Sequence, residues 1–309
     1  MSSSFIISLL VGTLRTSIPI ILAALGQVYV HKSGTLDLSV EGTMIFSCLM
    51  SFIAAALTKS LTFALIIGGV SGLCYSFIMA HLTVNLKSNQ VISGTALTML
   101  ATGLSSYLYR VVFGIRSLPP IIENFKPINF GFLTKIPFIG PILFNHNFTF
   151  YFMLLLVIIT WFIMDKTSYG LKIKAVGEFP RAADSKGIEV NKIRFQSILI
   201  GGLYSGFAGA SMSLGYMNTY TDQMIAGRGF IAIAVVVFAR WLPIRVLFAA
   251  LLFGFANTLQ MRLQSIGVAV PIQLLQALPY ILTVVVLLGV SKYVKFPSYF
   301  TQAYSRDKK

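Results

Sequence analysis

Long apolar segments separated by short polar ones make up most of this chain. Those that approach or reach the roughly 20 mainly apolar residues needed to cross a bilayer as a helix are residues 5–30, 40–57, 61–84, 91–113, 148–164, 195–217, 230–241, 243–263 and 271–290. The seventh is short for a full crossing. Because the segments are continuously apolar rather than alternating, they predict helices and exclude the strands of a membrane barrel. We therefore expect an all-α integral membrane protein, a polytopic bundle of about 8–10 transmembrane helices.

The one long polar stretch between these segments, residues 166–194, contains the pattern of a short helix. Pro180 suits the first helical position, and Gly187 suits the left-handed position just past the end. The residues between them, 181–186, make about two turns, roughly 10 Å at 1.5 Å per residue. Because so short a helix is marginal in water, we expect it to be held by docking on something else.

Composition supports a membrane location. The chain has 309 residues, of which 56% are hydrophobic and only 11% charged, whereas a soluble domain carries about 25% charged residues. The net charge of +15 raises the question of nucleic acid. However, the basic residues gather in the 166–194 loop and in the C-terminal tail, as they do on the cytoplasmic face of membrane proteins. We expect anionic lipid headgroups, and no nucleic acid, to be their partners.

The loops predict the topology everywhere except at the N-terminus. Four candidate crossings follow the 166–194 loop, so the loop and the tail lie on one side, together with Arg240 and Arg245. Five crossings precede the loop, which places the N-terminus outside. A sixth would place it inside, and would come from a split of the first segment between Arg15 and Pro19 or from a broken helix around 37–42. The sequence favours neither count.

Residues 114–147 form the longest external loop, which is rich in proline. We expect it to fold as a cap on the outer rim; a solvent-exposed tether is the alternative. The small-xxx-small spacing of Gly202 and Gly206 lets helices approach closely. That approach is either internal packing or a subunit interface.

Two carboxylates lie at the edge of an apolar segment. Asp37 and Glu41 are four residues apart, which on a helix places both charges on one face at a cost. A broken segment would relieve this repulsion. Broken helices commonly line substrate paths, because the backbone N–H and C=O groups left unpaired at the break need polar partners.

Neutral polar side chains form further sets inside or beside the apolar segments. They could bind a polar solute by matching its donors and acceptors, or they could simply form hydrogen bonds between helices, worth about 0.6 kcal/mol each. The residues that we predict to line a substrate pathway are Asp37, Glu41, Asn89, Gln90, Ser93, Thr95, Asn257, Gln260, Gln273 and Gln276.

The sequence contains no pattern for covalent chemistry. It has no GxxxxGK[ST] loop for ATP, and its three histidines, His31, His81 and His146, show no metal-ligand spacing. We expect no enzyme activity, no metal site and no cofactor bound by this chain.

Five stretches resemble a known family. They are SGTLDLSVEG (33–42), NQVISGTAL (89–97), GLKIKAVGEFPRAADSKGIEVNKIR (170–194), GGLYSGFAGASMSLGY (201–216) and AGRGFIAIAVVVFARWLP (226–243). They are similar to the permease subunits of bacterial ABC importers in the branched-chain amino acid and ribose superfamily, and within it to nucleoside-uptake permeases. The resemblance runs from about residue 13 to 288. It implies a single transmembrane permease domain over 1–309, with an external loop at 114–147 and a cytoplasmic coupling loop at 165–194.

The resemblance also implies that residues 177–188 contain a coupling helix that sits in a cleft of a cytoplasmic ATPase. The residues implied in this contact are Gly177, Glu178, Pro180, Arg181, Ala182, Ala183, Asp184, Lys186, Gly187 and Ile188. Its charged members are candidates for interfacial pairing, and Ala182 and Ala183 for close packing.

The chain departs from the family pattern at a few positions. Asp37 and Ser39 stand where Asn and Gly are usual, Phe179 where Asn is common, and Ala239 in place of Gly. Asp37 thereby adds a charge near the predicted pathway.

The resemblance implies a translocating subunit in the bacterial cytoplasmic membrane that takes up a nucleoside or a related polar heterocycle. Its expected partners are an ATPase that binds ATP and Mg²⁺, a sister permease rather than a second copy, and an extracytoplasmic substrate-binding protein or lipoprotein. The alternatives are a sugar or riboflavin-like substrate and, more distantly, an ATP-independent secondary transporter or a membrane enzyme.

Overall fold

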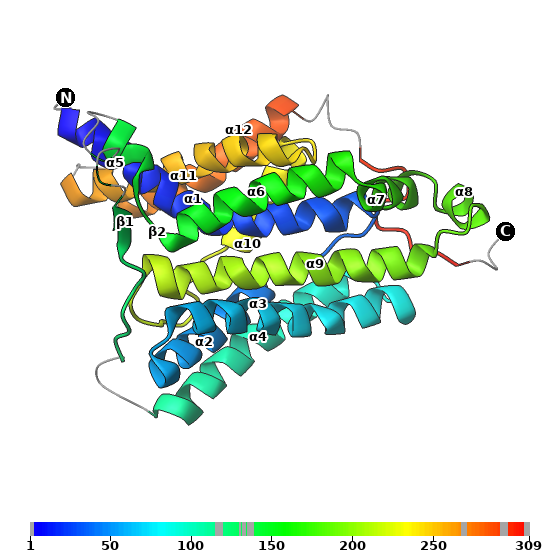
Figure 1. The fold of residues 1–309 in the computed structure, drawn as a ribbon, viewed down its shortest axis with the longest axis horizontal. Coiled ribbons are helices and arrows are strands. Elements are labelled where there is room, and N and C mark those ends of the chain that lie inside the picture. The colour runs from blue at the N-terminus through cyan, green and yellow to red at the C-terminus, as the bar shows by residue number, and fades with distance from the viewer. Residues whose placement is uncertain are drawn as a thin grey trace.

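The computed structural model describes residues 3–114, 120–129, 131, 134, 139–266, 271–290 and 296–305. These form a bundle of helices that run mostly along its long axis (Figure 1). The elements are α1 (Ser3–Lys32), α2 (Val40–Thr58), α3 (Leu61–Ala80), the π-helical turn η1 (His81–Asn85), α4 (Gln90–Phe113), β1 (Pro127–Asn129), α5 (Ile139–Leu143), β2 (Asn145–Asn147), α6 (Phe148–Lys166), α7 (Ser168–Glu178), α8 (Pro180–Ser185), α9 (Val190–Ser211), the π-helical turn η3 (Met212–Tyr216), α10 (Arg228–Phe238), α11 (Pro243–Ile266) and α12 (Ile272–Val290).

The predicted fold class is confirmed. Among the described residues, seven helices are long and apolar enough to cross a membrane, and α10 is a shorter apolar helix. The described β structure is one antiparallel pair of three-residue strands, β1 and β2, in which Ile128 lies opposite His146. The protein is thus a multi-pass helical membrane protein.

The helix directions decide the topology that the sequence left open. The N-terminus lies at one end of the bundle, and α8 and the C-terminal residues lie at the other, which we call the α8 end (Figure 1). Helix α1 runs without interruption through Arg15 and Pro19, so the suggested split there is wrong. Its packing inside the bundle outweighs the single hydrogen bond that a proline removes. The break lies instead at residues 33–39, and it belongs to one crossing rather than adding another.

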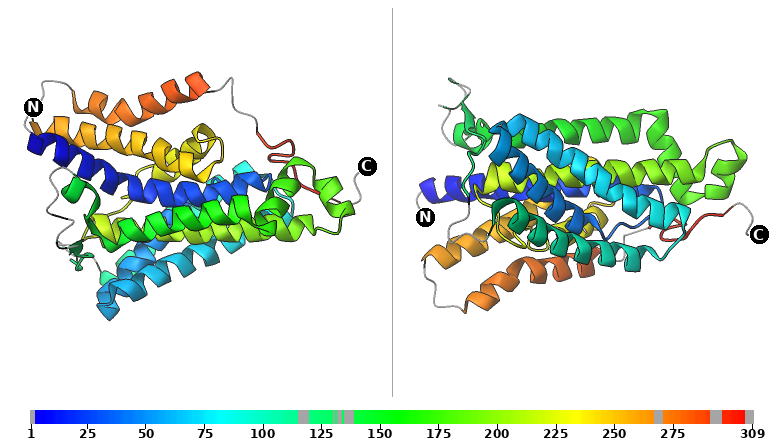
Figure 2. Two further views of the ribbon diagram at one scale, coloured as in Figure 1. Left: turned by 45° about the horizontal axis from the view of Figure 1, so that its top comes forward. Right: turned by 90° about the horizontal axis from the view of Figure 1, so that it is seen from below.

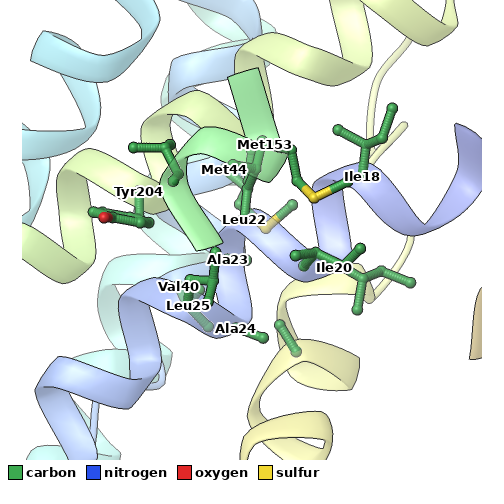
Figure 3. Close-up of a cluster of buried hydrophobic side chains, with 14 of the residues drawn as sticks. Ile18, Ile20, Leu22, Ala23, Ala24, Leu25, Val40, Met44, Met153 and Tyr204 are labelled. Carbon is green, nitrogen blue, oxygen red and sulfur yellow. The ribbon is translucent and has the colours of Figure 1, made fainter. Parts of the chain in front are cut away.

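Helix α1 lies at the centre of the bundle, with α2, α3 and α4 on one side and α11 and α12 on the other (Figures 1 and 2). Its second half is buried from Ile18 to His31 and mainly apolar, as expected of a helix surrounded by others, although it includes the polar Gln27 and His31. In the core, Leu22 and Leu25 of α1 lie beside Met44 of α2, Met153 of α6 and Tyr204 of α9 (Figure 3).

The described part of the external loop packs on the end of α9 rather than extending away. The backbone N–H of Ile122 donates to the carbonyl of Asn218 at 2.9 Å, and that of Phe125 donates to Leu214 at 3.0 Å. The Asn147 side chain donates to the carbonyl of Gly215 at 2.9 Å. This arrangement is the cap that the sequence suggested. Residues 115–119, 130, 132–133 and 135–138 of the loop lie outside the described residues.

Small residues bring α3 and α9 into close contact. A Cβ added to Gly202 would lie 2.1 Å from Ser76 Oγ and 2.7 Å from the Gly72 carbonyl, and one added to Gly206 would lie 2.4 Å from the Gly68 carbonyl. Of the two uses that the sequence left open for this spacing, the structure shows internal packing.

We expect Gly202→Ala to destabilise the protein, because overpacking a close contact costs about 1–3 kcal/mol. The measurement is the thermal unfolding midpoint of the purified protein in detergent. Gly103→Ala in α4 is the matched control, since nothing lies within 4 Å of a Cβ there. It should leave the midpoint unchanged or raise it slightly, and equal midpoints for the two variants would contradict the assigned contact.

Candidate functional site

Two helices begin inside the bundle instead of at its ends, and we call them the half-helices because irregular chain completes the crossing of each. The first is α2. Its first turns pack on Gly209 of α9, since a Cβ built there would lie 2.3 Å from the Met44 carbonyl. Gly209 is about 28 Å along α9 from the start of that helix at the α8 end, so α2 begins well inside the bundle. The second is α10, whose 11 residues span only about 16 Å. Helix α10 ends at the α8 end, where the Trp241 indole donates to His31 Nδ1 near the end of α1. Irregular chain completes each crossing, at residues 33–39 and 217–227.

The Glu41 carboxylate joins the starts of these two helices. It lies in the first turn of α2, and its two oxygens accept the backbone N–H groups of Gly227 at 2.8 Å and Gly229 at 2.7 Å, at the start of α10. Helix N-termini carry partial positive charge and stabilise an anion. Gly229 must be a glycine for this approach, because a Cβ there would lie 2.7 Å from Glu41.

Asp37 lies in the irregular segment just before α2 and is only 1% exposed. Its Oδ1 accepts both the backbone N–H of Ser39 at 2.8 Å and the Ser39 hydroxyl at 2.5 Å. The break between α1 and α2 therefore leaves Asp37 outside the helix and Glu41 inside it, as the unfavourable helical spacing of the two carboxylates suggested.

The first three turns of α4 hold the 33–39 segment in place. The Gln90 side-chain oxygen accepts the N–H of Leu36 at 2.8 Å, and the Thr98 hydroxyl donates to the Leu38 carbonyl at 3.1 Å. Asn89 caps α4 by accepting the N–H groups of its first turn. Of the polar residues predicted at the start of the fourth span, Gln90 and Asn89 thus have structural partners.

A polar stripe runs along the exposed side of α4. Thr95, Thr98, Thr102, Ser106 and Arg110 recur every three or four residues and are partly or fully exposed, so they share one helix face. The Ser106 hydroxyl donates to Asp222 Oδ1 at 2.9 Å, which connects the stripe to the segment leading into α10. Of these, Thr95 was predicted to line the substrate pathway. Ser93 faces inward, where it bonds the Ser88 hydroxyl at 2.8 Å.

The predicted amides Asn257 and Gln260 line a cavity of about 370 Å³ between α1, α10, α11 and α12. Arg228 lines the same cavity; its guanidinium donates to the carbonyls of Met224 and Ile225 and lies 5.9 Å from the Tyr216 ring. Sequence reasoning missed Arg228, although a lone arginine between two glycines in an apolar segment was a usable signal.

The other predicted amide pair lies on α12. Gln273 is exposed there, and the side chain of Gln276 lies outside the described residues. The structure therefore brings Asn257 and Gln260 together with each other and with Arg228. It also brings Asp37, Glu41 and Gln90 to the region where residues 36–39 and the starts of α2 and α10 meet, which we call the joint between the half-helices.

Residues 165–194, which were predicted to form the coupling loop, contain the predicted two-turn helix. Helix α8 has Pro180 at its N-terminus, and Gly187 follows it with φ +81. An additional 11-residue helix, α7, precedes it, and α8 projects beyond the other helices (Figure 1).

The residues implied in ATPase contact divide into two groups. Gly177, Pro180 and Ala183 are buried within the chain. Glu178 accepts the Ser298 hydroxyl at 3.0 Å, and Asp184 accepts the Tyr304 hydroxyl at 2.9 Å. Facing outward are Arg181, Ala182, Lys186 and Gly187, together with Phe179, which is 64% exposed. Ile188 is half-buried.

The chain matches the model of the family described as "Branched-chain amino acid transport system / permease component" over residues 9–290. The chain belongs to this family. This match confirms the family resemblance seen in the sequence motifs. The chain is thus an ABC transporter permease, and we refer to it below as the permease.

The permease is similar over most of its length to named relatives. It is 35% identical to the putative glucose ABC transporter permease protein TsgC13 of Haloferax volcanii, over 98% of this chain and 99% of that protein. It is 36% identical to the guanosine ABC transporter permease protein NupQ of Bacillus subtilis, over 92% of each chain. It is 32% identical to the nucleoside ABC transporter permease protein NupC of Lactococcus lactis, over 88% of each. No solved structure gives a significant match.

We expect Glu41→Ala to lower the stability of the permease, because each N–H left unpaired inside the bundle costs about 1–3 kcal/mol. Glu41→Gln keeps one acceptor oxygen and should fall between this variant and the wild type. The measurement is thermal unfolding in detergent. Glu189→Gln is the control, since the Glu189 side chain is 73% exposed. An equal effect at both positions would contradict the hydrogen bonds assigned between Glu41 and the start of α10.

Proposed function

We propose that this permease is the membrane-spanning subunit of an ATP-driven importer that carries a nucleoside or a related polar heterocycle across the bacterial cytoplasmic membrane. The observation that supports this most directly is the similarity to a guanosine permease and a nucleoside permease over about nine-tenths of each chain. A protein with this role makes and breaks no covalent bond of its substrate, so it is not an enzyme.

The outward face of α8 is the docking element for a cytoplasmic ATPase. Phe179 and Ala182 offer an apolar centre, and Arg181 and Lys186 a basic rim, which is the arrangement of a compact interface anchor. Glu178 and Asp184 hold the loop from within. ATP and Mg²⁺ are bound by the ATPase, and this chain needs no cofactor.

The substrate pathway follows the polar face of α4 and the joint between α2 and α10. This face has exposed hydroxyl groups in a membrane span, where polar groups face a cavity or a partner. The cavity lined by Asn257, Gln260 and Arg228 opens beside α10 and offers amide and guanidinium donors to a heterocycle or a sugar. Asp37 and Glu41 position the half-helices, with their carboxylates directed at the backbone.

The importer contains further subunits. A sister permease covers the polar face of α4, so that the pathway is enclosed between two chains. An extracytoplasmic substrate-binding protein or lipoprotein delivers the substrate at the end opposite α8. Membrane lipids surround the apolar outer faces and meet the basic residues of the α8 end.

A sugar is the second candidate substrate. It is favoured by the similarity to the putative glucose permease, which covers 98% of this chain. The donors in the cavity suit ring hydroxyls as well as a base.

The deciding experiment is substrate uptake by proteoliposomes that contain the complete complex. The ATPase faces the interior of the vesicle, and ATP is enclosed there. We expect radiolabelled guanosine to accumulate with ATP and not with a non-hydrolysable analogue, and glucose not to accumulate. Accumulation of glucose alone would move the assignment to the second candidate. Accumulation that needs an ion gradient and no ATP would overturn the importer.

We expect the double variant Phe179→Ala, Arg181→Glu to lose at least nine-tenths of the ATPase that co-purifies with the permease, because it removes the anchor and inverts the charge beside it. Leu86→Ala is the matched control: Leu86 is 63% exposed and lies between η1 and α4, not in α8. Retention of the ATPase by the double variant at the control level would show that α8 is not the docking element.

A further inference from the structure

Residues 296–305, which we call the C-terminal segment, follow α12 and run along the α8 end (Figure 1). The segment contains little regular structure and was not assigned a role from the sequence. It contacts three parts of the bundle that are far apart in the chain, and backbone groups make several of the contacts.

The first part is the coupling loop. The N–H of Tyr299 donates to the Gly177 carbonyl at 3.1 Å, at the end of α7. The hydroxyls of Ser298 and Tyr304 donate to Glu178 and Asp184, at 3.0 and 2.9 Å. The segment is therefore bonded to both helices of the coupling loop, on the side away from the outward face of α8.

The second part is the irregular segment before α2. The N–H of Thr301 donates to the Gly34 carbonyl at 2.9 Å. Space is tight there: Gly34 has φ +86, and a Cβ on it would lie 3.1 Å from the Tyr299 carbonyl and 3.3 Å from Gly177. Gly34, Gly177 and the C-terminal segment thus pack together without room for a side chain.

The Arg194 guanidinium connects the irregular segment before α2 with the C-terminal segment. It is 2% exposed; its Nε donates to the Ser33 carbonyl at 3.2 Å and its Nη1 to the Gln302 carbonyl at 2.6 Å. A buried guanidinium cannot exchange these acceptors for water at small cost. Arg194 therefore keeps residues 33–34 and the C-terminal segment at a fixed separation.

The third part is the end of α10. The Phe296 ring lies 5.3 Å from Trp241, and the Phe300 ring lies 5.2 Å from His31. Since Trp241 itself donates to His31, the ends of α1 and α10 and the C-terminal segment form one packed cluster.

We propose that the C-terminal segment, held by Arg194, transmits movement of the coupling loop to the two half-crossings that meet at Glu41. It is hydrogen-bonded to α7 and α8 at one edge and to Gly34 at another, and the Phe296 ring packs against Trp241 after α10 at a third. Close-packed contacts shift as a unit rather than deforming. Arg194 acts as a positioning residue and contacts neither ATPase nor substrate. This inference rests on the proposed importer function.

The test is the number of substrate molecules transported per ATP hydrolysed by the complete reconstituted complex. We expect Arg194→Gln to lower this ratio at least tenfold, while the amount of ATPase that co-purifies stays within twofold of wild type. Gln302→Ala is the matched control and should leave the ratio unchanged, because Arg194 uses only the backbone carbonyl of Gln302. An unchanged ratio in Arg194→Gln, or transport and hydrolysis that fall in parallel, would overturn the proposal.

A second variant covers the case in which Arg194→Gln does not assemble. Ser298→Ala with Tyr304→Phe removes two hydroxyls near the surface and should lower the same ratio at least threefold with the ATPase still bound. A wild-type ratio in this variant would equally overturn the proposal.

Failure of the proposed function is separately visible, since the wild-type complex would then transport no substrate. In that case hydrogen exchange of the complex decides. We expect the amides of Tyr299 and Thr301 to stay protected both without nucleotide and with a non-hydrolysable ATP analogue. Loss of protection in either state would show that the segment detaches and transmits nothing.

Discussion

A backbone N–H group inside a membrane has no water to bond to, and this constraint shapes the centre of the permease. Two helices begin in the interior, so their first N–H groups need partners there. Glu41 supplies acceptors for α10 from the first turn of α2. One carboxylate thereby lies at the positive ends of two helices that run in opposite directions, which stabilises its charge.

This arrangement determines what surrounds it. Because the starts of α2 and α10 are tied together, the irregular segments on either side of them must be held as well. Gln90 and Thr98 of α4 hold residues 36–38, and Ser106 of α4 holds Asp222. Helix α4 therefore touches both irregular segments through side chains, and the polar side chains of its stripe lie on its more exposed face. The same requirement explains why a polar stripe occurs on an otherwise apolar span.

The sequence predicted those features that depend on local pattern. Continuous apolar runs gave the helical fold class, and Pro180 with Gly187 gave α8 to within a residue. Helix α7 was not predicted, because SYGLKIKAVGE contains two glycines and little apolar periodicity, and it is stabilised by packing of Ile173 and Val176. The uninterrupted α1 was ambiguous because tertiary packing decides whether a proline ends a helix.

The candidate site was predictable in composition but less so in role. The sequence singled out Asp37, Glu41 and Gln90 as polar side chains in or beside apolar segments, and each lies at the joint between the half-helices. Whether such a group faces a solute or a backbone amide depends on contacts between residues that are far apart in the chain. Arg194 and the C-terminal segment went unnoticed for the same reason: their bonds to Ser33, Gly34 and Gln302 involve backbone carbonyls, which leave no mark on residue type.

The residues at positions 37 and 39, where we expected the family to carry Asn and Gly, bond to each other. Asp37 in place of Asn would leave a negative charge in the interior, and Ser39 in place of Gly supplies a hydroxyl that donates to that carboxylate, in addition to its own N–H. Charge-assisted hydrogen bonds of this kind are among the stronger ones. The carboxylate is thus directed back at its own segment, and the added charge does not require a cationic substrate. A neutral nucleoside therefore remains compatible with a chain that carries a buried aspartate beside its second membrane span.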